Sequence, residues 1–166
     1  IVVVGLPDAA VRESVERVST ALTSSGYHLP PGKTTINLAP ADLRKEGPSF
    51  DLAIALAWLI ASHQSSGEHS EDYAIIGELA LTGEIRRVKG VLPIALTAKE
   101  QGWRGILVPA DNAAEAAVVE GLEVIAVNNL REATSFLAGT TLITPKLVNT
   151  KALFENQIDT EHDLNE

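Results

Sequence analysis

One serine stands where a helix is expected to begin. Ser49 ends the stretch Arg44-Lys45-Glu46-Gly47-Pro48-Ser49, directly ahead of an apolar run that starts at Asp51-Leu52. Backbone N–H groups at a helix N-terminus stabilise developing negative charge, so a nucleophile with an oxyanion hole is one interpretation. A helix cap is the other, because Ser and Asp are preferred capping residues. The spacing alone favours the cap, since a nucleophile also needs a base within hydrogen-bond reach.

Other motifs that could carry chemistry are weaker. Gly5 follows an apolar run, but Pro7 stands where a dinucleotide-binding turn needs a second glycine. His63 and His69 lie in a polar loop without the short spacing that holds metal ligands in place, so a solvated loop is favoured over a metal site. The sequence contains no G-x-x-x-x-G-K-[ST] phosphate-binding loop and no cysteine, which excludes thiolate catalysis and disulfides.

Basic residues gather in two short segments. One directly precedes Ser49, and the other follows Gly83-Glu84. Such a local patch could bind phosphates even on an acidic protein. The alternative is weak surface ion pairs on solvated loops, Lys45 with Glu46 and Glu84 with Arg86. Both interpretations stay open at this stage, and the lack of interleaved aromatics gives base stacking no support. The candidate nucleic-acid-binding residues are Arg44, Lys45, Arg86, Arg87 and Lys89.

Composition indicates one globular domain. The 166 residues are 45% hydrophobic and only 4% aromatic, so the core must consist largely of Ala, Val, Leu and Ile. There are 22 acidic against 13 basic side chains, a net charge of −9, which is unusual for a free-standing nucleic-acid binder. No apolar run is long enough to span a membrane and no export signal is visible, so we expect a cytoplasmic location and no membrane partner.

Strand and helix patterns alternate along the chain, which predicts an α+β fold of two layers with helices packed on a mixed sheet. From Lys151 onward five acids face one base, so residues 144–166 are expected to form an acidic linker and residues 1–143 the folded domain. The first residue is Ile and the chain has no Met, which suggests an excerpt. Strands are predicted over 1–4, 34–38, 105–108 and 123–127, and a hairpin around Thr82-Gly83. A first helix is predicted from an N-cap at Asp8 to near Gly26, and further helices over 51–61, 93–101, 113–120 and 130–137.

Several blocks in order resemble one known family. Gly47-Pro48-Ser49 and the block 77–90, GELALTGEIRRVKG, are similar to the proteolytic domain of Lon-type proteases. Blocks 4–14, VGLPDAAVRES, and 37–47, NLAPADLRKEG, together with Val91-Leu-Pro-Ile94, look more like the N-terminal domain of Mg-chelatase-like AAA+ ATPases, the ComM/YifB family. The resemblance covers residues 1 to about 138. It implies the fold of ribosomal protein S5 domain 2, with the first strands of the domain missing from this chain.

The resemblance also implies a site and a departure from it. In Lon-type enzymes the serine of the G-P-S motif works with a lysine near the start of the helix after the Gly-Glu hairpin. Ser49 matches that serine, whereas Leu92 stands at the lysine position. Leucine cannot accept a proton, and Lys89 is the only fallback base nearby. Ser49 is therefore expected to be a vestigial nucleophile, with no catalytic residue in this chain; an active Ser–Lys peptidase is the alternative.

The function implied by the resemblance lies in a larger protein. Members of the family place this domain ahead of an AAA+ motor, and those resembling the competence protein are implicated in ATP-driven branch migration of DNA. We therefore expect a non-catalytic domain that contributes to ring assembly and DNA handling, with self-association and possibly DNA as partners. No cofactor or metal is expected in this chain, and ATP and Mg are expected in a downstream domain. A pure oligomerisation module is a further alternative.

Overall fold

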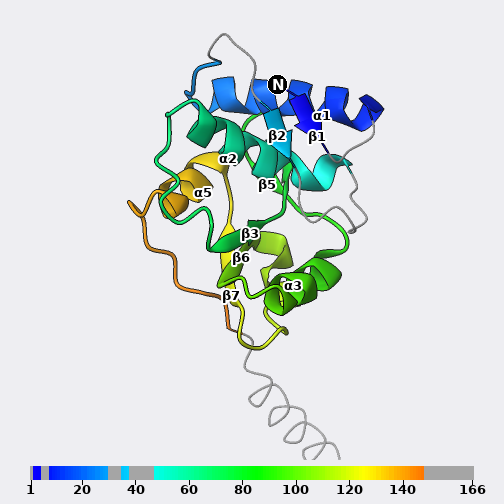
Figure 1. The fold of residues 1–166 in the computed structure, drawn as a ribbon, viewed down its shortest axis with the longest axis vertical. Coiled ribbons are helices and arrows are strands. Elements are labelled where there is room, and N and C mark those ends of the chain that lie inside the picture. Colours follow the sequence, from blue (N-terminus) through cyan, green and yellow to red (C-terminus); the bar gives the residue numbers. More distant parts are fainter. Residues whose placement is uncertain (1, 5–7, 30–34, 38–46, 148–166) are drawn as a thin grey trace, which may run out of the picture.

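Seven short strands and five α-helices are the main elements of the part of the chain that the computed structural model describes, residues 2–4, 8–29, 35–37 and 47–147 (Figure 1). The strands are β1 (Val2–Val4), β2 (Thr35–Asn37), β3 (Tyr73–Ile75), β4 (Glu78–Leu79), β5 (Ile85–Arg86), β6 (Gly105–Pro109) and β7 (Glu123–Val127). The α-helices are α1 (Asp8–Ser24), α2 (Asp51–Ala61), α3 (Val91–Glu100), α4 (Ala113–Ala116) and α5 (Leu130–Leu137), with 3₁₀ turns η1 (Gly47–Phe50) and η2 (Ala110–Asn112).

The strands form three sheets within the described residues. The largest is parallel with the order β3-β6-β7, and its register pairs Tyr73 with Gly105 and Ile106 with Val124. Strands β1 and β2 form a parallel pair, and β4 and β5 form an antiparallel hairpin. The central strand β6 is buried at every residue, as expected for an apolar run in the middle of a parallel sheet.

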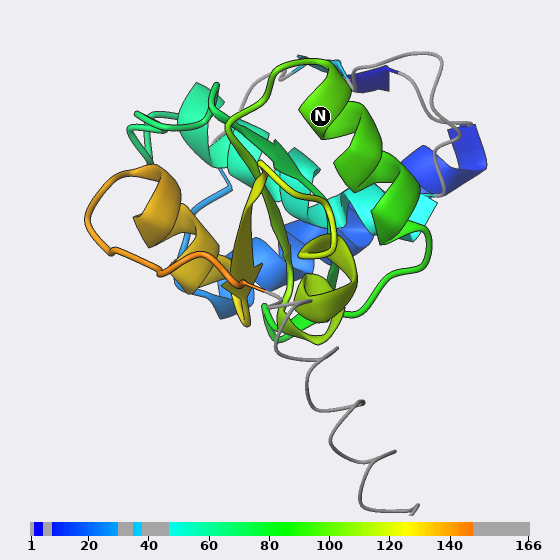
Figure 2. The same cartoon turned by 90° about the horizontal axis from the view of Figure 1, so that it is seen from below.

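Helices cover both faces of the β3-β6-β7 sheet, because its side chains alternate between two hydrophobic clusters. Leu107 and Ile125 point into a cluster shared with α1, α2 and α5. Ile106 and Val124 point into a second cluster shared with α3 and α4. Figure 2 shows α5 and α3 on opposite sides of the strands. The α+β class is thus confirmed, while this sheet has a helical layer on each face and not on one alone.

Helix α2 runs through the interior, as its sequence predicts. Its 11 residues DLAIALAWLIA have no polar face, and seven of them are buried. Leu52, Ile54 and Leu59 are almost fully removed from solvent in the first cluster. A helix that is apolar all round is stable only when covered on every side, and here α1, α5 and the sheet supply that cover.

Most element predictions are confirmed, with three differences. Strand β3 was not predicted, because Tyr73–Ile75 is a three-residue run behind a polar loop and too short to show a period. Helix α4 ends at Ala116, four residues short of the predicted end at Glu120. Helix α3 begins at Val91, so Pro93 lies inside its first turn, where its missing N–H has no intrahelical partner to lose.

The predicted acidic linker from 144 onward lies largely outside the described residues. Its described start, 144–147, forms no helix or strand, although the Lys146 N–H donates to the Val124 carbonyl at 2.7 Å. Among the described residues, every helix is too short or too polar to cross a membrane.

Candidate functional site

Ser49 lies in η1, directly ahead of α2, and is buried. Its carbonyl accepts the Gly77 N–H at 2.8 Å, and the Gly77 carbonyl accepts the Leu52 N–H at 3.0 Å, which fixes the turn against the link between β3 and β4. The first residue flanking α2 is Phe50, and no side chain caps the helix. The cap interpretation of Ser49 is therefore wrong. Within the described part of the chain, no side chain forms a hydrogen bond with its hydroxyl.

A buried ion pair stands two residues beyond the serine. Asp51 is fully buried, and its carboxylate accepts the Arg17 Nε–H at 2.8 Å and an Nη2–H at 3.1 Å. The Leu79 N–H adds a longer bond of 3.3 Å. The hydrogen bond to Asp51 raises the pKa of Arg17, so the cation is firmly held. One carboxylate thus joins α1, α2 and β4.

Arg17 was not among the residues that the sequence singled out. The available signal was Asp51 itself. A carboxylate at the start of a fully apolar helix cannot be buried unpaired, so a cation from another element was required. Spacing could not show which of the basic residues would supply it, since Arg17 and Asp51 are 34 positions apart.

Leu92 lies at the position where a base for Ser49 would be expected, and Lys89 lies three residues before it. Leu92, the second residue of α3, is half-buried and packs against the second hydrophobic cluster. Lys89 is exposed in the loop ahead of α3. Among the described residues, Lys89 takes part in no ion pair and no side-chain hydrogen bond.

Three basic residues share one short segment, residues 86–90, which we call the basic loop. Arg86, Arg87 and Lys89 are all exposed, and none forms an ion pair with another described residue. The Glu84–Arg86 ion pair of the alternative interpretation is thus absent from the described region. The other two candidate cations, Arg44 and Lys45, lie outside the described residues.

Asn112 attaches the basic loop to the domain. Its side chain is 1% exposed. The Val88 N–H donates to Asn112 Oδ1 at 3.0 Å, and Asn112 Nδ2 donates to the Val88 carbonyl at 2.9 Å. The sequence gives no sign of this contact, because the two residues are 24 positions apart.

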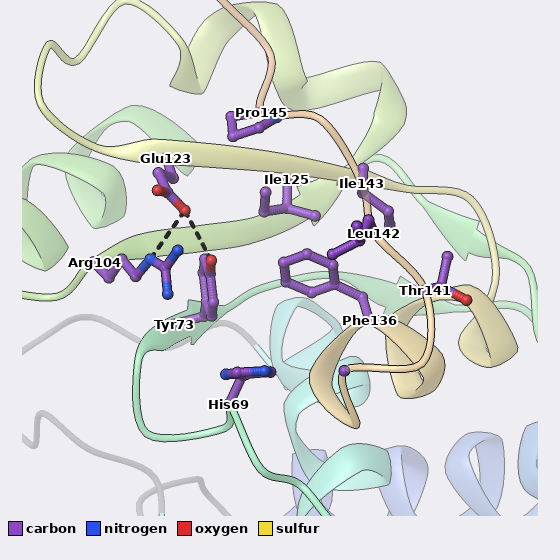
Figure 3. Close-up of a pocket in the computed structure, with 11 residues that line it drawn as sticks. His69, Tyr73, Arg104, Glu123, Ile125, Phe136, Thr141, Leu142, Ile143 and Pro145 are labelled. Atoms are coloured by element: carbon purple, nitrogen blue, oxygen red, sulfur yellow. Dashed lines mark hydrogen bonds and ion pairs between the residues drawn. The ribbon is translucent and has the colours of Figure 1, made fainter.

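A pocket of about 290 Å³ lies where strands β3, β6 and β7 begin (Figure 3). The Tyr73 hydroxyl donates to Glu123 Oε2 at 2.8 Å, and Arg104 Nε lies 3.3 Å from the same oxygen. The Tyr73 ring also meets Phe136 edge to face at 5.2 Å. Burial, followed by the bond to Glu123, raises the pKa of Tyr73 to about 12. We call these four residues the Tyr73 cluster.

The Tyr73 cluster could not be predicted from the sequence, because its members come from β3, β7, α5 and the loop before β6. His69, from the loop singled out as a possible metal site, also lines this pocket. Its Nδ1 atom lies 3.7 Å from an Asp72 carboxylate oxygen. Among the described residues, no three His, Asp or Glu side chains gather closely enough to hold a metal ion.

The sequence places this chain in the Mg-chelatase class of proteins. The sequence model of the family described as subunit ChlI of Mg-chelatase matches residues 1–112. The chain therefore belongs to the ChlI family of Mg-chelatase-like proteins.

Relatives in this class are much longer than the chain. YifB of Escherichia coli is 44% identical over 136 residues, which are 82% of this chain and 27% of YifB. The competence protein ComM of Haemophilus influenzae is 40% identical over 136 residues, 82% of this chain and 26% of ComM. The chain thus spans about a quarter of these relatives.

Two more distant similarities have informative names. Lon protease 2 of Bacillus subtilis is 31% identical over 120 residues, 72% of this chain and 20% of the protease. The DNA repair protein RadA of Listeria monocytogenes is 32% identical over 95 residues, 57% of this chain and 20% of RadA. The chain is thus similar both to a protease and to a protein of DNA repair.

Proposed function

We propose that this chain is a non-catalytic domain of a Mg-chelatase-like AAA+ ATPase, in which it contributes to assembly and to DNA handling during branch migration or recombination. The non-catalytic role is supported by the side chains that surround Ser49. Hydrolysis by a Ser–Lys pair needs an amine at hydrogen-bond distance from the hydroxyl. The described residues offer no such partner: Leu92 stands at the expected position, and Lys89 is exposed.

Support for DNA handling comes from the basic loop. Its three cations are exposed and unpaired among the described residues, so they are available to phosphate oxygens. Self-repulsion among adjacent cations is relieved when an anion binds, which favours a polyanionic partner. The similarity to a competence protein and to a DNA repair protein agrees with this partner.

The remaining parts of the proposal concern the longer parent protein. In this account, ATP and Mg are bound by an AAA+ domain outside this chain, which then needs no cofactor of its own. The ring assembles from copies of the parent, and the protein acts in the cytoplasm. The ChlI family membership and the greater length of YifB and ComM support this division of labour.

The DNA part is tested by fluorescence anisotropy with labelled 30-base-pair DNA at several salt concentrations. We expect binding that weakens with salt, and about tenfold weaker binding at low salt for R86A/R87A. The matched control is R12A/K99A, which removes the same charge from two exposed residues elsewhere. If long-range attraction alone held the DNA, the two double variants would weaken binding equally.

Equal affinity of wild type and R86A/R87A at low salt would overturn the role of the basic loop in DNA handling. Light scattering on the same samples distinguishes a pure oligomerisation module. Such a module would show a concentration-dependent size and no DNA binding at any salt concentration.

A further inference from the structure

Asn112 stands at a helix-capping position, but its side chain bonds the basic loop instead. It directly precedes α4, the place where an Asn side chain commonly caps the helix, yet it forms no cap bond. Both ends of its amide are used on one residue of the basic loop, Val88. A side-chain amide that bonds the N–H and the carbonyl of the same residue acts as a neighbouring strand would, and it holds that residue extended.

The two amide bonds favour an extended backbone at Val88. Side chains alternate from one face to the other along extended chain. Val88 is buried in the second hydrophobic cluster, whereas Arg87 and Lys89 on either side are exposed. With Val88 extended, we expect the two cations to lie on the same face, with their Cα atoms about 6–7 Å apart. Successive phosphates along one strand of a nucleic acid have a comparable spacing.

We propose that Asn112 is a positioning residue that fixes Arg87 and Lys89 as a pair contacting successive backbone phosphates of one DNA strand. This inference rests on the proposed function and deepens it by naming the part of DNA recognised. Contacts of this kind read no base sequence, because phosphates are the same at every position. The absence of aromatic residues from the basic loop agrees with a backbone contact, since base binding uses aromatic stacking.

A double-mutant cycle tests the inference with the full chain. DNA affinity and its salt dependence are measured for wild type, N112A, R87A/K89A and the triple variant. We expect N112A to weaken DNA binding about three- to tenfold. We also expect R87A/K89A to reduce the slope of log affinity against log salt by about 2. In the R87A/K89A background, N112A should have no further effect, because the side chains that it positions are gone.

A second buried polar residue provides the matched control. Thr134 is buried in α5, and its hydroxyl donates to the Leu130 carbonyl at 2.8 Å. T134V removes a buried hydrogen bond outside the loop, so it should lower the melting temperature without changing DNA affinity. Amide hydrogen exchange at Val88 should accelerate in N112A and remain slow in T134V.

The possible outcomes separate this inference from the proposed function. If the wild type binds DNA through Arg86 and Arg87 but N112A weakens binding in the R87A/K89A background as much as in the wild type, only the positioning role is overturned. An unchanged DNA affinity of N112A despite fast exchange at Val88 overturns it as well. A wild-type chain that binds no DNA overturns both. Equally tight, loop-dependent binding of polyglutamate would assign the loop to acidic proteins and also contradict the phosphate contact.

Discussion

A serine becomes a nucleophile only when a neighbouring base takes its proton. In this chain Ser49 is held by backbone bonds between its own carbonyl and Gly77, while its hydroxyl has no partner among the described side chains. The carboxylate of Asp51, two residues later, accepts a hydrogen bond from Arg17. Two nearby polar residues thus differ in their surroundings: the Ser49 hydroxyl has no described side-chain partner, whereas Asp51 joins α1, α2 and β4.

Another residue-scale property, the titration of Tyr73, can be measured directly. Its pKa of about 12 lies above the usual value near 10, chiefly because of burial and then because of the bond to Glu123. Tyr73 therefore contributes stability that is complete below about pH 10 and is lost as the pH rises through about 12. Ultraviolet or NMR titration should show the late transition, and E123Q should bring it closer to 10. An unchanged pKa in E123Q would contradict the stated role of Glu123.

At the scale of elements, the Arg17–Asp51 pair connects α1 to α2 in a way that neither helix's pattern predicts. Helix α2 is apolar enough to be buried by hydrophobicity alone, about 1.5–3 kcal/mol for each large side chain. The pair adds geometric definition, because a planar guanidinium and a carboxylate fit in few orientations. The same carboxylate also accepts the Leu79 N–H, so the start of the hairpin depends on this connection.

Removing the cation of this pair should be costly. R17A leaves a fully buried carboxylate without its partner, and we expect a loss of about 3–5 kcal/mol in the free energy of unfolding. Urea denaturation followed by circular dichroism measures it. R12A, an exposed arginine on the same helix, should change stability by less than about 0.5 kcal/mol. A loss below about 1 kcal/mol in R17A would mean that Asp51 finds another partner or water.

Across the whole molecule, features that depend on a few adjacent residues could be predicted, whereas contacts between distant residues could not. The α2 interior position, the Thr82-Gly83 hairpin and strands β6 and β7 each follow from a few adjacent residues, so the sequence was sufficient. The exposed basic loop was also predicted, since Arg86 and Arg87 are contiguous. The Tyr73 cluster and the Arg17–Asp51 pair depend on residues that only the folded chain brings together, and periodicity carries no record of such pairs.

The same lack of long-range information limits what the sequence predicts about the candidate site. The family resemblance singled out Leu92 and Lys89 beside Ser49, because it supplied a pattern to align. It could not reveal that Asn112 holds Val88, which turns a run of basic residues into a pair with a fixed direction.

Labelling with a serine-directed fluorophosphonate, followed by mass spectrometry, tests whether this domain is a peptidase. We predict that Ser49 in the wild type remains unlabelled and that the wild type behaves like S49A. Stoichiometric labelling at Ser49 that K89A abolishes would show a working Ser–Lys pair and would overturn the proposed non-catalytic role.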